Sequence, residues 1–387
     1  MDPTADTTTH SVTTFGQVMD LRSKMRSARP SLTLFLVAIV LRSASLVIAT
    51  RVFGLELSGP AAFQDGPSYV SLASTWPLYP YAETTGYFPF YPIVIKLFAL
   101  FIPSVELAAL LVSLLAGSLA VVIYGQVLRS DTERWFEIAL VFCVFPFRWF
   151  NINQLAMSES LFMLLLLLSV LLTQKKHRVF SGVVLGFSWL TRLSGLLVMP
   201  AFLFRSLRSH ERVRTLLWLV PASVCLGLLG LYFAVRFHDP LIYSRQNIGL
   251  WGGGRFSYPF SAYAAGFLDP GISLIRKPYI AFVIIQYFGG LIVGIVRWRR
   301  NRPELLFCIL WALPFLLLQT VLRGKGTNWG FISSARLMMP AAPAILLFWL
   351  EGLSQRTLYA LFAVLVPLTF LFNIEEFRVQ IPSVLIR

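Results

Sequence analysis

One acidic residue, Asp65, stands in the stretch FQDGPSYVSL without any other charge nearby, since the next acids along the chain are Glu56 and Glu83. Asp before Gly and Pro is common turn chemistry, because its side chain can hydrogen-bond the local backbone. The same carboxylate is suited to act as a general base that takes a proton from an attacking hydroxyl group. Such a base needs to be ionised and free of a fixed cation, so we expect Asp65 to be unpaired.

Three arginines are candidates for holding the phosphate group of a donor. Arg192 lies in TRLS and Arg336 in SSARL, so each has neighbouring hydroxyl groups that can complete an anion site. Arg255 follows three glycines, which allow close approach of the backbone. Arg192 and Arg336 have the alternative of snorkelling toward the membrane surface or pairing with an acid.

A second acid, Glu159, follows Ser158 at the start of an apolar run. Ser158 can cap the helix and Glu159 can interact with its positive end, which is a purely structural role. The alternative is that Glu159, like Glu83, binds the acceptor or supplies a second acidic group. Other residues in the same stretches are candidates for lining the substrate: Tyr69, Tyr87, Tyr91, Gln246 and Trp251.

Metal and nucleotide chemistry is not indicated. The chain has no HExxH, no paired Cys and no Asp-x-Asp motif, so we expect no protein-bound metal. It also has no P-loop and no GxGxxG followed by an acid, so we expect no nucleotide as direct substrate and no cofactor. A sugar donor activated on a lipid is consistent with this pattern.

The elements that position these residues are predicted to be membrane-spanning helices. Of the 387 residues, 57% are hydrophobic and only 13% are charged, which is typical of an integral membrane protein. The net charge of +15 comes from short basic clusters between apolar runs. This distribution follows the positive-inside rule and argues against nucleic acid as a partner.

Apolar runs suitable for spans lie at 31–53, 105–128, 135–150, 157–173, 213–236, 278–297, 304–322, 337–351 and 357–373. All basic clusters lie on the cytoplasmic side only if 86–102 does not cross and 179–205 crosses twice. We therefore predict an all-α protein with about eleven transmembrane helices. The segment 86–102 is expected to lie on the outer surface, and 179–205 to form a hairpin of two short helices turning near residues 191–195.

The chain is expected to have three parts. Residues 1–30 are predicted to be a disordered basic cytoplasmic tail, 31–373 a polytopic transmembrane domain and 374–387 a tail on the outer side. Two outer loops, 54–104 and 237–277, hold much of the Trp-, Gly- and Pro-rich sequence, including Asp65.

Several stretches together resemble a known family. QDGPSYVSLAS, TTGYFPFYPIVIKL, FPFRWFNINQLAMSESLFML, LGFSWLTRLSG, HDPLIYSRQNIGLW and SSARLMMPAAP occur in the order seen in the PIG-V-like mannosyltransferases, over nearly the whole chain after the tail. These are polytopic GT-C glycosyltransferases that use a polyprenyl-phosphate sugar. The resemblance implies a GT-C-like fold and a catalytic role for Asp65. The sequence departs from the family at Gln64, Met157 and Leu337, which affects the expected sugar and acceptor more than the expected fold.

We expect a glycosyltransferase that moves a sugar, mannose by resemblance, from a polyprenyl-phosphate donor to a lipid or glycan acceptor on the outer or luminal face. A transporter or flippase of lipid-linked sugars and a non-catalytic subunit of a transferase complex are the alternatives, and a partner subunit is possible. No Asn-x-Ser/Thr sequon is present, which favours a prokaryotic plasma membrane over the endoplasmic reticulum.

Overall fold

The protein is an all-helical bundle. The computed structural model describes residues 9–75, 79, 81–208, 216–250, 255–256, 258–270, 272, 276–298, 303–323 and 333–385. The helices are α1 (Thr9–Val52), α2 (Gly66–Ser74), α3 (Phe90–Phe98), α4 (Val105–Leu128), α5 (Trp135–Val144), α6 (Phe147–Ile152), α7 (Glu159–Gln174), α8 (Arg178–Trp189), α9 (Met199–Arg208), α11 (Leu219–Phe237), α12 (Ile242–Leu250), α13 (Ser261–Leu268), α14 (Arg276–Trp298), α15 (Pro303–Val321), α17 (Ser334–Met338), α18 (Ala342–Leu350) and α19 (Gln355–Leu385).

Short 3₁₀ turns and one minimal strand pair complete the fold. The turns are η1 (Gly59–Ala62), η2 (Ala82–Gly86), η3 (Leu193–Val198), η4 (Leu216–Trp218) and η5 (Met339–Ala341). Strands β1 (Arg255–Phe256) and β2 (Leu322–Arg323) pair antiparallel, with Arg255 opposite Arg323. The pair is two residues long on each side, so the predicted all-α class is confirmed.

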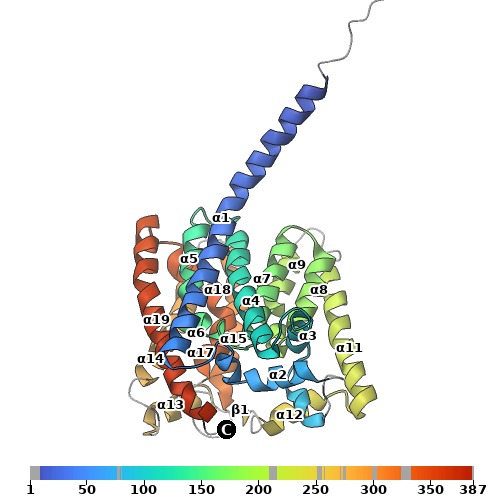
Figure 1. Ribbon diagram of the computed structural model, residues 1–387, viewed down its shortest axis with the longest axis vertical. Helices are drawn as coiled ribbons and strands as arrows, with labels where there is room; N and C mark the ends of the chain where they lie inside the picture. The colour runs from blue at the N-terminus through green and yellow to red at the C-terminus, as the bar shows by residue number, and fades with distance from the viewer. Residues whose placement is uncertain are drawn as a thin grey trace, which may run out of the picture.

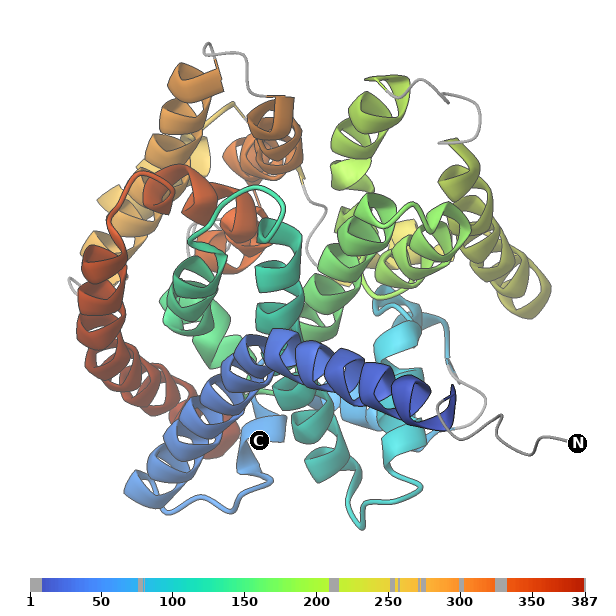
Figure 2. The same cartoon turned by 90° about the horizontal axis from the view of Figure 1, so that it is seen from above.

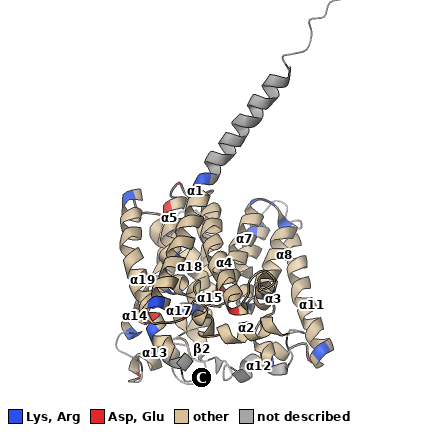
Figure 3. Ribbon diagram, in the orientation of Figure 1, with Lys and Arg blue, Asp and Glu red and all other residues tan. Residues whose placement is uncertain are grey.

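The long helices run side by side, and short helices lie across one end of the bundle (Figure 1). Seen from above, α19 and α11 lie at opposite edges of the molecule (Figure 2). Lys, Arg, Asp and Glu residues lie mainly toward the two ends of the bundle, and few of them lie in the middle section of the ribbon (Figure 3). This separation is what a membrane requires, because a charge in the hydrocarbon layer is costly.

Among the residues that the structure describes, six helical segments are long and apolar enough to cross a membrane: Arg29–Val52, Val105–Leu128, Leu219–Phe237, Arg276–Trp298, Glu304–Val321 and Gln355–Ile381. Shorter apolar helices lie at Trp135–Val144, Glu159–Gln174 and Ser334–Leu350. Many large apolar side chains point outward, such as Leu228 at 61% and Val235 at 71% exposure. The chain is therefore a multi-pass integral membrane protein, although the structure does not confirm the predicted number of eleven spans.

Two segments that the apolar runs left ambiguous have clear structures. Residues 179–205 form short helices, α8 and α9, that reverse direction through the turn before η3. Helix α3, in the predicted surface segment 86–102, is seen end-on in Figure 1 and so lies across the bundle axis. Tyr91 and Ile95 of α3 are fully buried, so one face of this helix packs against the bundle.

The N-terminal segment differs from the prediction. Helix α1 begins at Thr9, inside the tail expected to be disordered, and continues outward from the bundle as one helix (Figure 1). Extending an existing helix needs no new nucleation step, which gives a physical reason for this continuation beyond the apolar span.

The turn between α6 and α7 is held against α4 by close contacts. A Cβ atom at Gly117 would lie 1.9 Å from Oδ1 of Asn153, so only glycine allows this approach. The Ser113 hydroxyl group donates to the carbonyl oxygen of Met157 at 3.0 Å. Tyr91 also contacts Ser113, with 2.7 Å between the hydroxyl oxygens. These contacts fix the turn that presents Ser158 and Glu159.

Candidate active site

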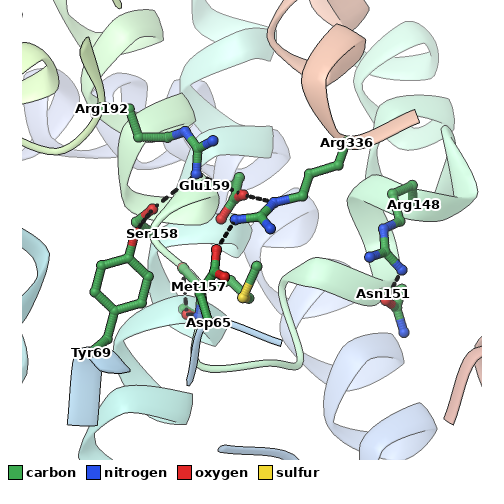
Figure 4. A network of polar contacts seen from close by, with 10 residues as sticks. Asp65, Tyr69, Arg148, Asn151, Met157, Ser158, Glu159, Arg192 and Arg336 are labelled. Carbon is green, nitrogen blue, oxygen red and sulfur yellow. Dashed lines mark hydrogen bonds and ion pairs between the residues drawn. The ribbon is translucent and has the colours of Figure 1, made fainter. Parts of the chain in front are cut away.

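Asp65 ends the loop after α1 and directly precedes α2. Its backbone carbonyl accepts hydrogen bonds from the amides of Ser68 and Tyr69, at 3.1 and 3.2 Å, but its side chain makes no capping hydrogen bond. The carboxylate instead forms an ion pair with the guanidinium of Arg336 (Figure 4). The expectation that Asp65 has no cation beside it is therefore wrong. The cation comes from 271 positions along the chain, beyond the reach of local sequence.

The loop that carries Asp65 is tightly wound. A Cβ atom at Gly66 would lie 2.1 Å from the carbonyl oxygen of Ala61 and 3.3 Å from Cβ of Ala156. Gln64 has a φ of 55°, in the left-handed region that most residues avoid. The direction of the Asp65 side chain thus depends on a glycine at position 66.

Arg336, on α17, links two carboxylates. Its Nη2 atom donates to Oδ2 of Asp65, and its Nε atom donates to Oε1 of Glu159. The side chains are little exposed, at 16% for Arg336, 13% for Asp65 and 1% for Glu159. Solvent therefore screens these interactions less than it screens pairs on a protein surface.

A second arginine reaches the same acid from the turn after α8. Nη1 of Arg192 donates to Oε1 of Glu159 at 2.7 Å and to the hydroxyl oxygen of Ser158 at 3.2 Å. We call Asp65, Glu159, Arg192 and Arg336 the arginine–carboxylate cluster. Its four formal charges sum to zero, which offsets part of the cost of burying each of them.

Glu159 is the first residue of α7, where the helix dipole favours a negative charge. The structural role considered for Glu159 is therefore compatible with the geometry. Ser158, however, makes no side-chain capping hydrogen bond to α7. The second oxygen of Glu159, Oε2, is buried and has no hydrogen-bond partner among the described residues. A buried carboxylate oxygen without a partner is costly, so a hydroxyl donor from a substrate would be favoured there.

Tyr69 supports the cluster from α2. Its hydroxyl oxygen lies 2.9 Å from that of Ser158, which in turn accepts from Arg192. Burial is the main factor that raises the pKa of Tyr69 above its usual value, so the hydroxyl group stays protonated. Its ring packs against Tyr87 and Tyr91, with centroids 5.2 and 5.0 Å away. Tyr91 is fully buried, and so it supports the site more than it lines a substrate space.

A small cavity lies beside the arginines. It has a volume of about 30 Å³ and is lined in part by Glu159, Arg192, Ser194, Gln319 and Arg336. This is room for about two water molecules, so a phosphate group needs the side chains to move apart. Gln319 is 1% exposed and was missed in the sequence, although a polar residue within an apolar run is itself a signal of function.

The remaining predicted site residues lie elsewhere or outside the described part. Gln246 is on α12, and no hydrogen bond joins it to the arginine–carboxylate cluster within the described residues. Trp251 lies outside the described residues, as do the side chains of Glu83 and Arg255. In the part of the chain that the structure describes, no group of three or more His, Cys, Asp or Glu residues could hold a metal ion.

Comparisons place the fold in a known class. No protein-family model and no curated protein matches the sequence. Several chains of solved structures match the fold, and two of them follow. ArnT from Cupriavidus metallidurans, bound to undecaprenyl phosphate, is 16% identical with a TM-score of 0.56. The Archaeoglobus fulgidus oligosaccharyltransferase, tethered to an acceptor peptide with an NVT sequon, is 13% identical with a TM-score of 0.54.

The matches cover 85% and 90% of this chain but only 62% and 55% of the ArnT and oligosaccharyltransferase chains. Both structures are GT-C glycosyltransferases, and the present chain has a GT-C-like fold. The chain spans a little over half the length of these enzymes, and the likeness at this identity concerns the fold alone.

Proposed function

We propose that the protein is a membrane glycosyltransferase that moves a sugar from a polyprenyl-phosphate donor to a hydroxyl group of a lipid or glycan acceptor. The observation that carries the proposal is the arginine–carboxylate cluster, which combines a base and two phosphate-binding cations at one end of the bundle. The GT-C-like fold supports it, and so does the undecaprenyl phosphate bound to ArnT. Mannose is proposed as the sugar from the motif resemblance.

The reaction assigns a role to each member of the cluster. The acceptor oxygen attacks the anomeric carbon of the sugar while the bond from that carbon to the phosphate oxygen breaks. Asp65 takes the proton from the acceptor hydroxyl group, and the polyprenyl phosphate leaves with the electron pair. Arg192 and Arg336 hold the negative charge on the departing phosphate. Glu159 keeps both guanidinium groups in place.

Donor binding is proposed to exchange partners within the cluster. In the structure Arg336 is paired with Asp65, and a base paired in this way is hindered from accepting a proton. A phosphate that enters beside Arg192 and Arg336 competes for the same guanidinium donors. Asp65 is then released when the donor arrives, and the widening of the small cavity accompanies the exchange.

We also propose that the site faces outward or toward a lumen. Lys175 and Lys176 follow α7 at the end of the helix opposite to Glu159. Basic loops mark the cytoplasmic side by the positive-inside rule, which leaves Glu159 and its partners on the other side.

The test is transfer of labelled mannose from polyprenyl-phosphate mannose by the purified protein in lipid, with a panel of lipid and glycan acceptors. We expect Asp65→Asn to lose about a hundred- to ten-thousandfold in rate, as for removal of a general base. Glu376→Gln is a matched control, because the Arg148–Glu376 pair has similar exposure, 13% and 14%, outside the cluster. A rate for Asp65→Asn within about threefold of the wild type would rule out the base, and movement of the intact donor across the membrane without transfer would indicate a transporter.

A further inference from the structure

A second, larger cavity lies away from the arginine–carboxylate cluster. It has a volume of about 380 Å³ and is lined by residues of α4, α7, α9, α15 and α18 and of the loop after α4. No residue lines both this cavity and the small one beside Arg192 and Arg336. Its volume falls in the range of about 300–1,000 Å³ typical of pockets for small molecules. We call it the distal pocket.

The helices place the distal pocket at the opposite end of the bundle. Helix α7 starts with Glu159 in the cluster, and its lining residues run from Leu167 to Gln174 in its second half. In helix α15, Gln319 lines the small cavity beside the cluster, whereas residues between Glu304 and Trp311, at the other end of the helix, line the distal pocket. From Leu167 to Gln174 the helix advances seven residues at about 1.5 Å each, so the distal pocket is about 10 Å deep. The hydrocarbon layer of one leaflet is about 15 Å thick, so the distal pocket reaches through about two thirds of it.

The polarity of the distal pocket changes along its depth. Its inner wall is apolar and aromatic, with Leu167, Val170, Trp311 and Leu347 each at most 5% exposed. The polar lining residues come from the ends of helices and from the loop after α4: Ser130, Asp131, Gln174, Arg205, Arg208 and Glu304. A pocket that is charged at the membrane surface and apolar toward the midplane has the same order of groups as a lipid lying in its own leaflet.

The mouth presents both signs of charge. The Arg205 guanidinium lies over the Phe307 ring, 5.7 Å from its centroid, beside the apolar wall. Partial burial, followed by the nearby carboxylates of Glu304 and Glu351, raises the pKa of Asp131, while the Ser130 hydroxyl group and Arg205 lower it. The mouth thus has the carboxylates of Asp131 and Glu304 as well as the guanidinium groups of Arg205 and Arg208, and a cationic group would be favoured beside the two carboxylates.

We propose that the distal pocket binds a zwitterionic phospholipid with a primary amine, of the phosphatidylethanolamine class, from the leaflet opposite the candidate active site. One acyl chain lies between α7, α15 and α18, against Trp311 and Leu347. The phosphate contacts Arg205 and Arg208, and the ammonium contacts Asp131 and Glu304. This proposal is independent of the proposed transferase activity, because it uses none of the same residues.

Retention of lipid by the purified full chain tests the proposal, measured by native mass spectrometry after delipidation and addition of one lipid at a time. We expect one phosphatidylethanolamine to be retained about tenfold better than phosphatidylglycerol with the same chains, because one charge-assisted contact is lost with the uncharged glycerol head. A phosphatidylethanolamine with a photoreactive group in its acyl chain should label peptides from α15 and α18. Equal retention of the two lipids, or labelling elsewhere only, would overturn the assignment.

Two variants locate the bound lipid. Leu347→Trp places a larger side chain in the apolar part of the distal pocket and should abolish retention of the lipid. Leu228→Trp, at a side chain 61% exposed on α11, should leave retention of the lipid unchanged. If Leu347→Trp does not fold, Asp131→Asn at the mouth serves instead, and we expect it to remove the preference for phosphatidylethanolamine. Unchanged retention in the folded Leu347→Trp protein, or an unchanged preference in Asp131→Asn, would contradict the proposal. Binding of submicellar dodecylphosphocholine equal to that of phosphatidylethanolamine would indicate a site for soluble amphiphiles instead.

Discussion

The contact between Asp65 and Arg336 can be tested with a double-mutant cycle made of Asp65→Asn, Arg336→Gln and the combined variant. Each single change leaves its former partner without its opposite charge in a site where the two side chains are only 13% and 16% exposed. Charge-assisted hydrogen bonds contribute about 1.5–3 kcal/mol, and little is lost here to screening by solvent. We therefore expect each single variant to lose about 2–3 kcal/mol of unfolding free energy.

The combined variant is expected to lose clearly less than the sum of the two, with a coupling of about 1–3 kcal/mol. Arg336→Gln alone should be the more harmful single change, because Arg336 also holds Glu159. Glu159 would keep its contact with Arg192 at 2.7 Å, so the cluster would be weakened without being dismantled. Equilibrium unfolding in mixed micelles, followed by tryptophan fluorescence, measures these differences.

The same cycle tests the proposed exchange of partners. With saturating polyprenyl phosphate, Arg336 should contact the phosphate and not Asp65, so we expect the coupling to fall below about 0.5 kcal/mol, the level at which distant sites behave as additive. The Arg148–Glu376 pair, 2.6 Å apart, should keep its coupling in the presence of the same ligand. Additive effects of Asp65→Asn and Arg336→Gln without ligand would refute the ion pair. A coupling that polyprenyl phosphate leaves unchanged would refute the exchange.

Three further predictions concern the surroundings of the site and the topology. Gly66→Ala should lower the transfer rate, and it should lower the free energy of unfolding by about 1–3 kcal/mol, because the added Cβ would lie 2.1 Å from a backbone oxygen. The control is Gly227→Ala, which has no atom within 4 Å of the added Cβ and should be neutral or slightly stabilising in the same unfolding assay. Tyr69→Phe removes one hydroxyl contact of 2.9 Å and should cost about 1 kcal/mol of stability, and an unchanged unfolding midpoint would show that this contact contributes nothing. A topology reporter fused after Lys176 should report the cytoplasm and one inserted near Leu241 the opposite side, whereas the same side for both would contradict the proposed orientation.

Much of the fold could be predicted from the sequence, because long apolar runs identify membrane-spanning helices. The helices Val105–Leu128 and Arg276–Trp298 begin and end within two residues of the predicted spans at 105–128 and 278–297. The reversal of α8 and α9 was predicted from the positions of basic clusters alone. The number of membrane crossings is harder to predict, because some apolar helices are short. Glu159–Gln174, for example, has 16 residues, whereas an untilted span needs about 20.

The candidate site was predictable in its members and not in its contacts. Asp65, Glu159, Arg192 and Arg336 were each singled out from their local sequence, and the structure brings all four together. Pairing with an acid was one alternative for Arg192 and Arg336, but the partners could not be predicted. The four residues come from separate helices and turns, and charge spacing along one helix carries no information about such contacts. Gln319 was missed because its place beside Arg192 and Arg336 comes from the packing of separate elements, which the local sequence does not show.

The pairing of the cluster gives a physical reason for having two arginines and two carboxylates at one site. Two guanidinium groups aimed at a phosphate would be costly to bury without counterions, and the same holds for a lone base. Each group offsets the charge of another, as the contacts of Arg336 with Asp65 and Glu159 show. In the proposed exchange, a phosphate that replaces Asp65 at Arg336 would keep the guanidinium neutralised, so that the base would be set free without leaving a cation unpaired. In the proposed mechanism, an active base is conditional on a bound donor, which is why the loss of coupling on addition of polyprenyl phosphate is the decisive measurement.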